Sequence, residues 1–194
     1  MEVKYGIVFE GSQDLPALEA LIERLINECE CCNFSKILDP TISATDTYKT
    51  VLTQINIMTE TRQADVLFIF ADQDNKNEKK RSCYVRKLND KDSNLMEKVF
   101  LAIPNPHFEK WLLCDEPSVV DYFSIHNTDE LSTLKQQRSP KECLQHYSSL
   151  KQEYFGDTKT NLVNLMDLDL IERTDREFKH FRKDFKSFCN RNSN

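Results

Sequence analysis

Three acidic residues come directly after two apolar runs of the sequence, in positions suited to binding a metal ion. Glu10 follows the run at residues 4–9, and Asp72 and Asp74 follow the run at residues 66–70. If both runs are parallel strands of one sheet, their carboxyl ends meet at one edge, where ligands bind in such folds. Carboxylate oxygens suit Mg²⁺, which usually keeps waters that a substrate phosphate displaces. The spacing therefore predicts a Mg²⁺ site for phosphodiester chemistry. The alternative is that the acidic residues after the strands are structural: Asp14, before Pro16, would cap a helix, and Asp72 and Asp74 would form a solvated turn.

The elements that would position these carboxylates alternate between strands and helices. Apolar runs typical of buried parallel strands lie at residues 4–9, 34–38, 66–70 and 99–103. Helical patterns lie at residues 16–26, 48–55 and, in a basic stretch, 76–87. This alternation predicts an α/β fold, with a Rossmann-like parallel four-stranded sheet flanked by helices.

The second half of the chain has a different and more polar pattern. Short helices are expected at residues 107–115 and 117–123, polar helical sequence from residue 131, and a last helix over about 169–189. We therefore divide the chain into a sheet domain, residues 1–105, and a helical extension, residues 106–194, that packs on it.

Composition limits the classes of protein to which this chain can belong. Its 194 residues are 39% hydrophobic and 30% charged, as in globular domains. No apolar run approaches the roughly 18 residues that span a bilayer, and the start lacks a secretory signal, so we expect a cytoplasmic protein with no membrane partner. The net charge of −6 means that binding of nucleic acid must rely on a local basic patch, on metal ions or on a partner protein. A homo-oligomer is an open alternative.

The seven cysteines have no regular spacing. Three of them, Cys29, Cys31 and Cys32, cluster after the first helix, but no matching pair follows downstream that would complete a zinc site. An odd number of cysteines without the regular spacing of a disulfide framework predicts ordinary free thiols. The alternative is that some of them bind a metal ion or take part in redox chemistry.

The acidic motifs together resemble a known family. Glu10-Gly-x-x-Asp14 after the first strand, with Asp72-x-Asp74 after a later one, is similar to the Toprim domain of topoisomerases, primases and the overcoming-lysogenization-defect nucleases. The resemblance covers roughly residues 1–105, and makes this segment a Toprim-like catalytic domain. It implies that Glu10 is a metal ligand or general acid/base, and that Asp14, Asp72 and Asp74 bind Mg²⁺ or Mn²⁺.

A further segment extends the resemblance. Residues 103–115, which include Glu109-Lys-Trp-Leu-Leu-Cys-Asp115, are similar to a stretch in small stand-alone bacterial Toprim proteins often found in phage-defence neighbourhoods. This similarity implies that Glu109 is a catalytic ligand of a second metal ion, which would stabilise the attacking and leaving oxygens. The alternative is that Glu109 lies on a helix surface. Asp115 suits a cap or turn, and His107 either orients a phosphate or water or is structural.

A basic patch begins two residues after the Asp-x-Asp pair. The basic stretch contains Lys76, Lys79, Lys80, Arg81, Arg86 and Lys87. Its first four are the predicted nucleic-acid-binding residues. Such side chains position a nucleic-acid backbone whose scissile phosphate lies at the metal ions. The alternative is a solvated helix face.

These residues and the resemblance imply a Mg²⁺-dependent nuclease or related phosphodiesterase, acting on DNA or RNA in phage defence with an ATPase partner. Glu10, Asp72, Asp74 and Glu109 would be the catalytic residues. A toxin that cleaves a specific RNA would use the same site. The alternative from a different class is a non-catalytic Toprim-fold interaction or regulatory subunit of a defence complex.

Overall fold

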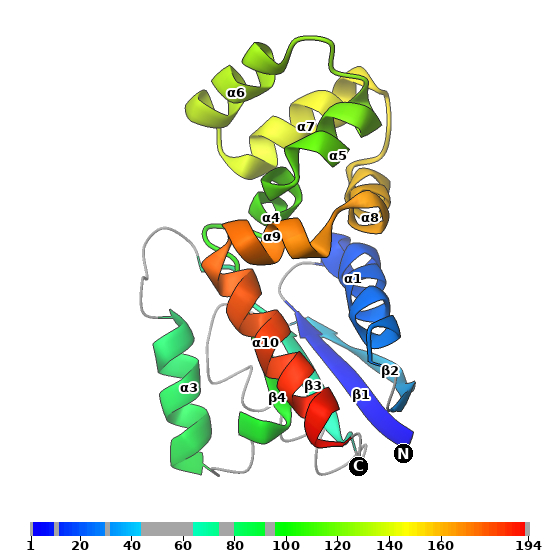
Figure 1. Cartoon of the computed structure of the whole chain (residues 1–194), viewed down its shortest axis with the longest axis vertical. Coiled ribbons are helices and arrows are strands. Elements are labelled where there is room, and N and C mark those ends of the chain that lie inside the picture. The colour runs from blue at the N-terminus through cyan, green and yellow to red at the C-terminus, as the bar shows by residue number, and fades with distance from the viewer. Residues whose placement is uncertain are drawn as a thin grey trace.

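A four-stranded parallel sheet forms the centre of the protein (Figure 1). The computed structural model describes residues 2–9, 12–29, 32–43, 64–73, 80–91 and 96–192. The strands are β1 (Glu2–Phe9), β2 (Asn33–Ser43), β3 (Val66–Phe70) and β4 (Val99–Ala102), in the order β2-β1-β3-β4. All three neighbouring pairs are parallel. The predicted α/β fold with a Rossmann-like sheet is confirmed.

The register aligns the carboxyl ends of the three strands that precede the acidic motifs. Phe9 of β1 lies opposite Phe70 of β3, and Phe70 lies opposite Ala102 of β4. Residues that follow these strands therefore leave the sheet at one level. The order of strands also reverses between β1 and β3, because β2 continues from β1 to one side while β4 continues from β3 to the other. Such a switch point is where open α/β sheets bind ligands.

Alternate residues of each strand enter two separate cores. In β3, Phe68 and Phe70 belong to the core that also contains Phe181 and Phe185, whereas Leu67 and Ile69 belong to the opposite one. The first core is covered by α1 (Leu15–Asn27) and α10 (Arg176–Arg191), and the second by α3 (Lys80–Lys91). The continuous apolar run of β3 is thus explained by burial on both faces.

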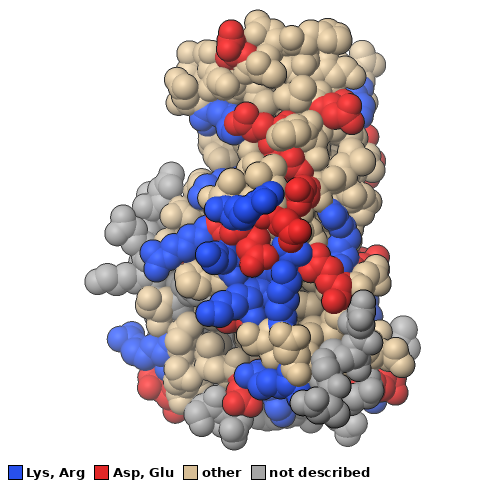
Figure 2. Space-filling view, in the orientation of Figure 1, with Lys and Arg blue, Asp and Glu red and all other residues tan. Residues whose placement is uncertain are grey.

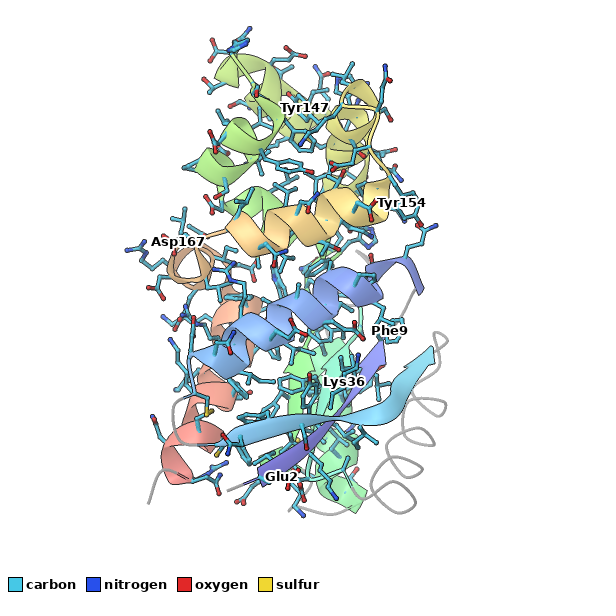
Figure 3. The ribbon with its side chains drawn as sticks, turned by 90° about the vertical axis from the view of Figure 1, so that its right-hand side faces the viewer. Glu2, Phe9, Lys36, Tyr147, Tyr154 and Asp167 are labelled. Atoms are coloured by element: carbon cyan, nitrogen blue, oxygen red, sulfur yellow. A yellow bond between two sulfur atoms is a disulfide. The ribbon has the colours of Figure 1, made fainter. Side chains whose placement is uncertain are left out.

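Short helices stack beyond the carboxyl edge of the sheet (Figure 1). A 3₁₀ turn, η1 (Ser12–Asp14), precedes α1, and the remaining helices are α4 (Glu109–Cys114), α5 (Glu116–Phe123), α6 (Thr128–Gln137), α7 (Pro140–Leu150), α8 (Phe155–Leu165) and α9 (Leu168–Thr174). In Figure 3, α8 lies alongside α1, and Tyr154 and Phe9 mark the side on which α8 begins and β1 ends. None of the helices in the described ranges is long and apolar enough to cross a membrane.

The C-terminal segment that was expected to form one helix forms two, α9 and α10. A single helix over residues 169–189 was predicted, but the chain is extended at Asp175, which separates α9 from α10. The Asp175 carboxylate accepts hydrogen bonds from the backbone N–H groups of Glu177 and Phe178, and so begins a new helix. The continuous helical pattern concealed this cap. The helix predicted at residues 48–55 lies outside the described residues.

The second strand is longer than predicted. It was expected at residues 34–38, but β2 continues to Ser43 and contains Pro40. Because β2 is at the edge of the sheet, a residue that lacks an N–H group is tolerated there.

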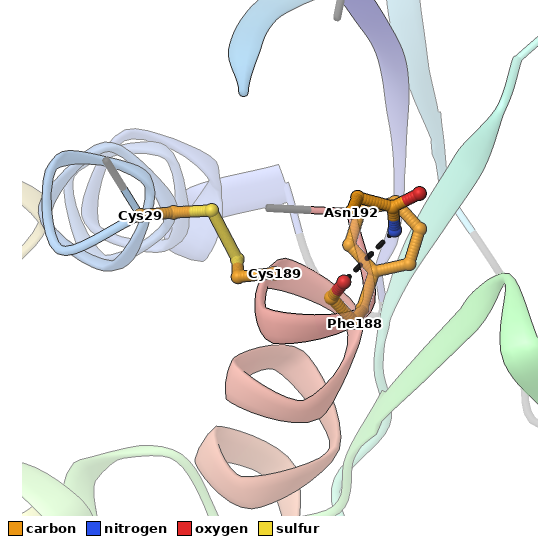
Figure 4. Close-up of a disulfide and its surroundings, with 4 residues drawn as sticks. All are labelled: Cys29, Phe188, Cys189 and Asn192. Atoms are coloured by element: carbon orange, nitrogen blue, oxygen red, sulfur yellow. Dashed lines mark hydrogen bonds between the residues drawn. A yellow bond between two sulfur atoms is a disulfide. The ribbon is translucent and has the colours of Figure 1, made fainter. Parts of the chain in front are cut away.

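A disulfide joins the carboxyl ends of the two helices on one face of the sheet (Figure 4). It links Cys29, just after α1, to Cys189 in the last turn of α10. The prediction of ordinary thiols is therefore wrong for these two residues. Their separation of 160 positions carries no local spacing signal, so the pairing is visible only in the folded chain.

Candidate functional site

Three of the predicted carboxylates converge at the switch point of the sheet. Asp14 comes from η1, which follows β1; Asp72 lies two residues after β3; and Glu109 begins α4. Their charges act on one another, since both Glu109 and Asp14 influence the titration of Asp72. Glu10 and Asp74 lie outside the described residues. The sequence places them four residues before Asp14 and two after Asp72.

Asp72 is held in place by the segment that leads into α4. The ladder between β3 and β4 continues past both strands, because Ala71 donates to the Ala102 carbonyl and Gln73 donates to the Pro104 carbonyl. Asp72 Oδ1 accepts a hydrogen bond of 3.1 Å from the Phe108 backbone N–H. Its Oδ2 lies 3.3 Å from His107 Nδ1. His107, left open between two roles by the sequence, contacts a predicted metal ligand.

The surroundings of Asp72 disfavour its charged form. Burial raises the pKa of its carboxyl group to about 6, and the negative charges of Glu109 and Asp14 act in the same direction. His107 opposes this shift through its charge and its hydrogen bond. A cation placed among these carboxylates would remove the repulsion, because opposite charge favours the ionised form.

A buried lysine joins the other two carboxylates. Lys159 of α8 is 2% exposed and forms an ion pair with Asp14, while its Nζ lies 3.7 Å from Glu109 Oε1. The same Nζ lies 4.7 Å from the centre of the Phe155 ring. Lys159 thereby links η1, α4 and α8 at the carboxyl edge of the sheet. A buried ammonium persists only when carboxylates pair with it.

Asp14 uses its side chain for this ion pair and not as a helix cap. It is at the N-cap position of α1, yet its carboxylate makes no capping hydrogen bond. The capping alternative raised by the sequence is thus not how the side chain is used. Asp115 shows the opposite outcome: it caps α5 through Ser118 and also accepts a 2.6 Å hydrogen bond from the Asp167 backbone N–H. Its interpretation as a cap is confirmed.

The orientation of α4 depends on a second buried carboxylate, Asp175. Trp111 Nε1 donates to Asp175 Oδ1 at 3.0 Å, and Lys110 Nζ lies 2.9 Å from Asp175 Oδ2. Because Asp175 also begins α10, these contacts fix α4 against the helix that covers the sheet. Glu109, adjacent to Lys110, is 4% exposed and so does not lie on a helix surface, which was the alternative for it.

The charge of the described cluster suits a divalent cation. Asp14, Asp72 and Glu109 bring three carboxylates, and Lys159 brings one ammonium group that pairs with two of them. Oxygen ligands of this kind are those that Mg²⁺ prefers. Among the described residues alone, no three His, Cys, Asp or Glu side chains are grouped closely enough to hold a metal ion.

Lys159 is the residue of this cluster that the sequence interpretation missed. A signal for its burial exists in the sequence, because Leu162 and Val163 follow it at spacings of three and four and are themselves buried. A lysine on the apolar face of a helix needs an acidic partner. The identity of that partner, 145 positions away, has no sequence signature.

The predicted basic patch falls mostly outside the described residues. Lys76 and Lys79 are not described, and Lys80 and Arg81 are placed only as the first residues of α3. Their role in binding nucleic acid stays a prediction.

No protein-family model, curated protein or solved structure matches this chain. The class is therefore defined by the fold alone, a Rossmann-like α/β protein with an acidic cluster at its switch point. Membership of the Toprim family stays a prediction.

The titration of Asp72 gives a test of the cluster without metal. In EDTA, we expect Asp72→Asn to unfold at a higher temperature than wild type at pH 8, by the equivalent of about 1 to 3 kcal/mol, because asparagine avoids burying a charge. The advantage should shrink as the pH falls from about 6.5 to 4, since wild-type Asp72 then takes up a proton. Thermal unfolding followed by circular dichroism measures both effects. An advantage that does not change with pH would contradict this assignment, and Asp129→Asn, at an exposed position of α6, is the control.

Removal of the buried ammonium group should destabilise the protein strongly. We expect Lys159→Met to lose about 3 to 5 kcal/mol of unfolding free energy, because Asp14 and Glu109 are left without their partner. Lys36→Met removes the same charge from the more exposed pair with Glu19, and should cost about 1 kcal/mol or less. Urea unfolding of both variants provides the comparison. Equal losses would show that the ion pairs of Lys159 are not important for the fold.

Proposed function

We propose that this protein is a Mg²⁺-dependent nuclease or related phosphodiesterase. The observation that carries this proposal is the convergence of Asp14, Asp72 and Glu109 at the switch point of a parallel sheet. These residues lie far apart in the sequence, and the two acidic motifs that the sequence places beside them, at Glu10 and Asp74, follow the same two strands. Lys159 offsets part of the charge of Asp14 and Glu109, and the negative charge that remains around Asp72 favours the binding of a further cation.

The proposed roles of the side chains follow from their contacts. Asp72, with Asp14, Glu109, Glu10 and Asp74, would hold one or two Mg²⁺ or Mn²⁺ ions. Bound ions of this kind polarise a phosphoryl oxygen and lower the pKa of water. The backbone N–H of Phe108 and the ring of His107 fix the orientation of the Asp72 carboxylate.

We propose that Lys159 holds the carboxylates of the site in place without contacting the substrate. Its ion pairs with Asp14 and Glu109 fix two carboxylates that come from different elements, and its burial leaves it little freedom to move. Preorganised charge of this kind costs no rearrangement when charge develops on the substrate.

A partner protein belongs to the same proposal. The net charge of −6 opposes association with nucleic acid, and a partner that supplies positive charge would overcome this repulsion. The resemblance noted above makes an ATPase the partner that we propose.

Cleavage of defined substrates tests the proposal. Plasmid DNA, single-stranded DNA and tRNA are incubated with wild type in Mg²⁺ or Mn²⁺, beside Asp72→Asn and Glu10→Gln. We expect metal-dependent cleavage that falls at least 100-fold in both variants, because each removes a charged ligand. Asp129→Asn, which changes an exposed carboxylate on α6, should retain the activity of wild type.

Calorimetric titration with Mn²⁺ separates a missing partner from a wrong assignment. If wild type cleaves nothing but binds Mn²⁺, and both variants lose that binding, the metal site stands and the partner is required. If wild type neither cleaves nor binds Mn²⁺, the proposed function is wrong, and the alternative of a non-catalytic subunit is favoured.

A further inference from the structure

A polar groove opens beside Gln73, the residue that follows Asp72. It has a volume of about 770 Å³ and lies between α3 and the first turns of α10. Gln73 is at its inner end, and charged residues of its walls include Arg86 of α3 with Arg176 and His180 of α10. Because side chains alternate along an extended chain, Gln73 and Asp72 point to opposite sides of the same segment. The groove therefore begins beside the acidic cluster but is distinct from it.

The walls of the groove bring together positive side chains from distant parts of the chain. Arg86 and Arg176 are exposed and are separated by 90 positions in sequence. Arg176 Nε lies 3.4 Å from His180 Nε2, so the two side chains share one edge of the groove. Asp90 and Glu177 also line it, which means that the positive charge is localised and not spread over the whole wall.

The positive charge continues along α10 beyond the groove. This helix contains six Lys and Arg residues against two Asp and Glu, and all but the buried Arg182, which pairs with three carboxylates, can add to the surface charge. Lys179 and Lys183 are exposed and follow Arg176 at spacings of three and seven, which places them on the same face of the helix. Figure 2 shows Lys and Arg side chains gathered over this part of the molecule. The groove is thus the inner end of a basic strip.

We propose that this groove and strip bind the phosphodiester backbone of a nucleic acid whose scissile phosphate lies at the acidic cluster. The inference rests on the proposed function, and it adds the path by which the substrate reaches the site. Three features support it: charge complementarity, the short connection from Gln73 to Asp72, and arginines on both walls, whose planar guanidinium groups match phosphate oxygens. Arg86 belongs to the basic stretch at residues 76–87 that the sequence predicts to bind nucleic acid, and the strip adds Arg176, Lys179 and Lys183 of α10 to it.

A pair of charge-reversal variants tests the groove. Arg86→Glu combined with Arg176→Glu is compared with Arg138→Glu combined with Lys141→Glu, which makes the same change of charge on the distant α6–α7 region. Binding of fluorescently labelled single-stranded DNA, duplex DNA and RNA of one sequence is measured by anisotropy in EDTA, so that no cleavage occurs. Circular dichroism checks the fold of each variant.

We expect the groove variant to bind at least 10-fold more weakly than wild type, with a salt dependence reduced by about one to two in log–log slope, because about two phosphate contacts are lost. The distant variant should stay within about threefold of wild type, on the order of 0.6 kcal/mol. Comparison of the affinities for the three probes shows whether the groove binds DNA or RNA more tightly.

Two results would overturn the inference. Equal weakening by both double variants would show that only net charge matters, and absence of binding by wild type would show that the groove does not bind nucleic acid. Hydrolysis of bis(p-nitrophenyl) phosphate by wild type with Mn²⁺ is measured in parallel, against Asp72→Asn. Absence of that reaction from wild type, together with absence of Mn²⁺ binding, contradicts the proposed function, whereas the contrast between the two charge-reversal variants decides the groove separately.

Discussion

The ion pairs of Lys159 are the interaction on which the arrangement of the site depends. A lysine that is 2% exposed is unfavourable unless carboxylates surround it, and the two that do so come from the turn after β1 and from the start of α4. Because Lys159 belongs to α8, the helical second half of the chain completes a cluster that begins on the sheet. The side-by-side arrangement of α1 and α8 is stabilised at the other end by Arg24, whose guanidinium group donates to the carbonyl groups of Val163 and Met166. The acidic cluster is therefore a product of both halves of the sequence.

A second set of buried charges holds α10 over the sheet. Asp175 accepts from Trp111 and begins α10, and Arg182, which is 4% exposed, pairs with Glu28, Asp169 and Glu172. The apolar side of α10 packs Phe181 and Phe185 against Phe68 of β3. Its opposite side is then free to present Arg176, Lys179 and Lys183 to solvent. One helix thus covers the core on one side and forms the basic strip on the other, which brings positive charge near the negative site.

The parts of the fold that local patterns determine could be predicted from the sequence. The apolar run at residues 66–70 matches β3 in full. Asp14, which follows β1, and Asp72, which follows β3, lie at the same edge of the sheet because parallel strands share their direction. Contacts between distant residues could not be predicted. The pairing of Lys159 with Asp14, the disulfide between Cys29 and Cys189 and the break of the last helix at Asp175 each depend on where other elements lie. In each case the residue type was visible, but its partner was not. Glu109 is intermediate: its place after the fourth strand suggested the site, and its burial became visible only in the fold.

The central claim is that the carboxylates at the switch point bind a divalent cation. Its most direct test is the anomalous difference map of crystals soaked in MnCl₂, compared with crystals of Asp72→Asn treated in the same way. The account predicts a peak beside the carboxylates of Asp72 and Glu109 in wild type and its loss in the variant. Manganese bound only elsewhere, with no peak at this edge of the sheet, would contradict it.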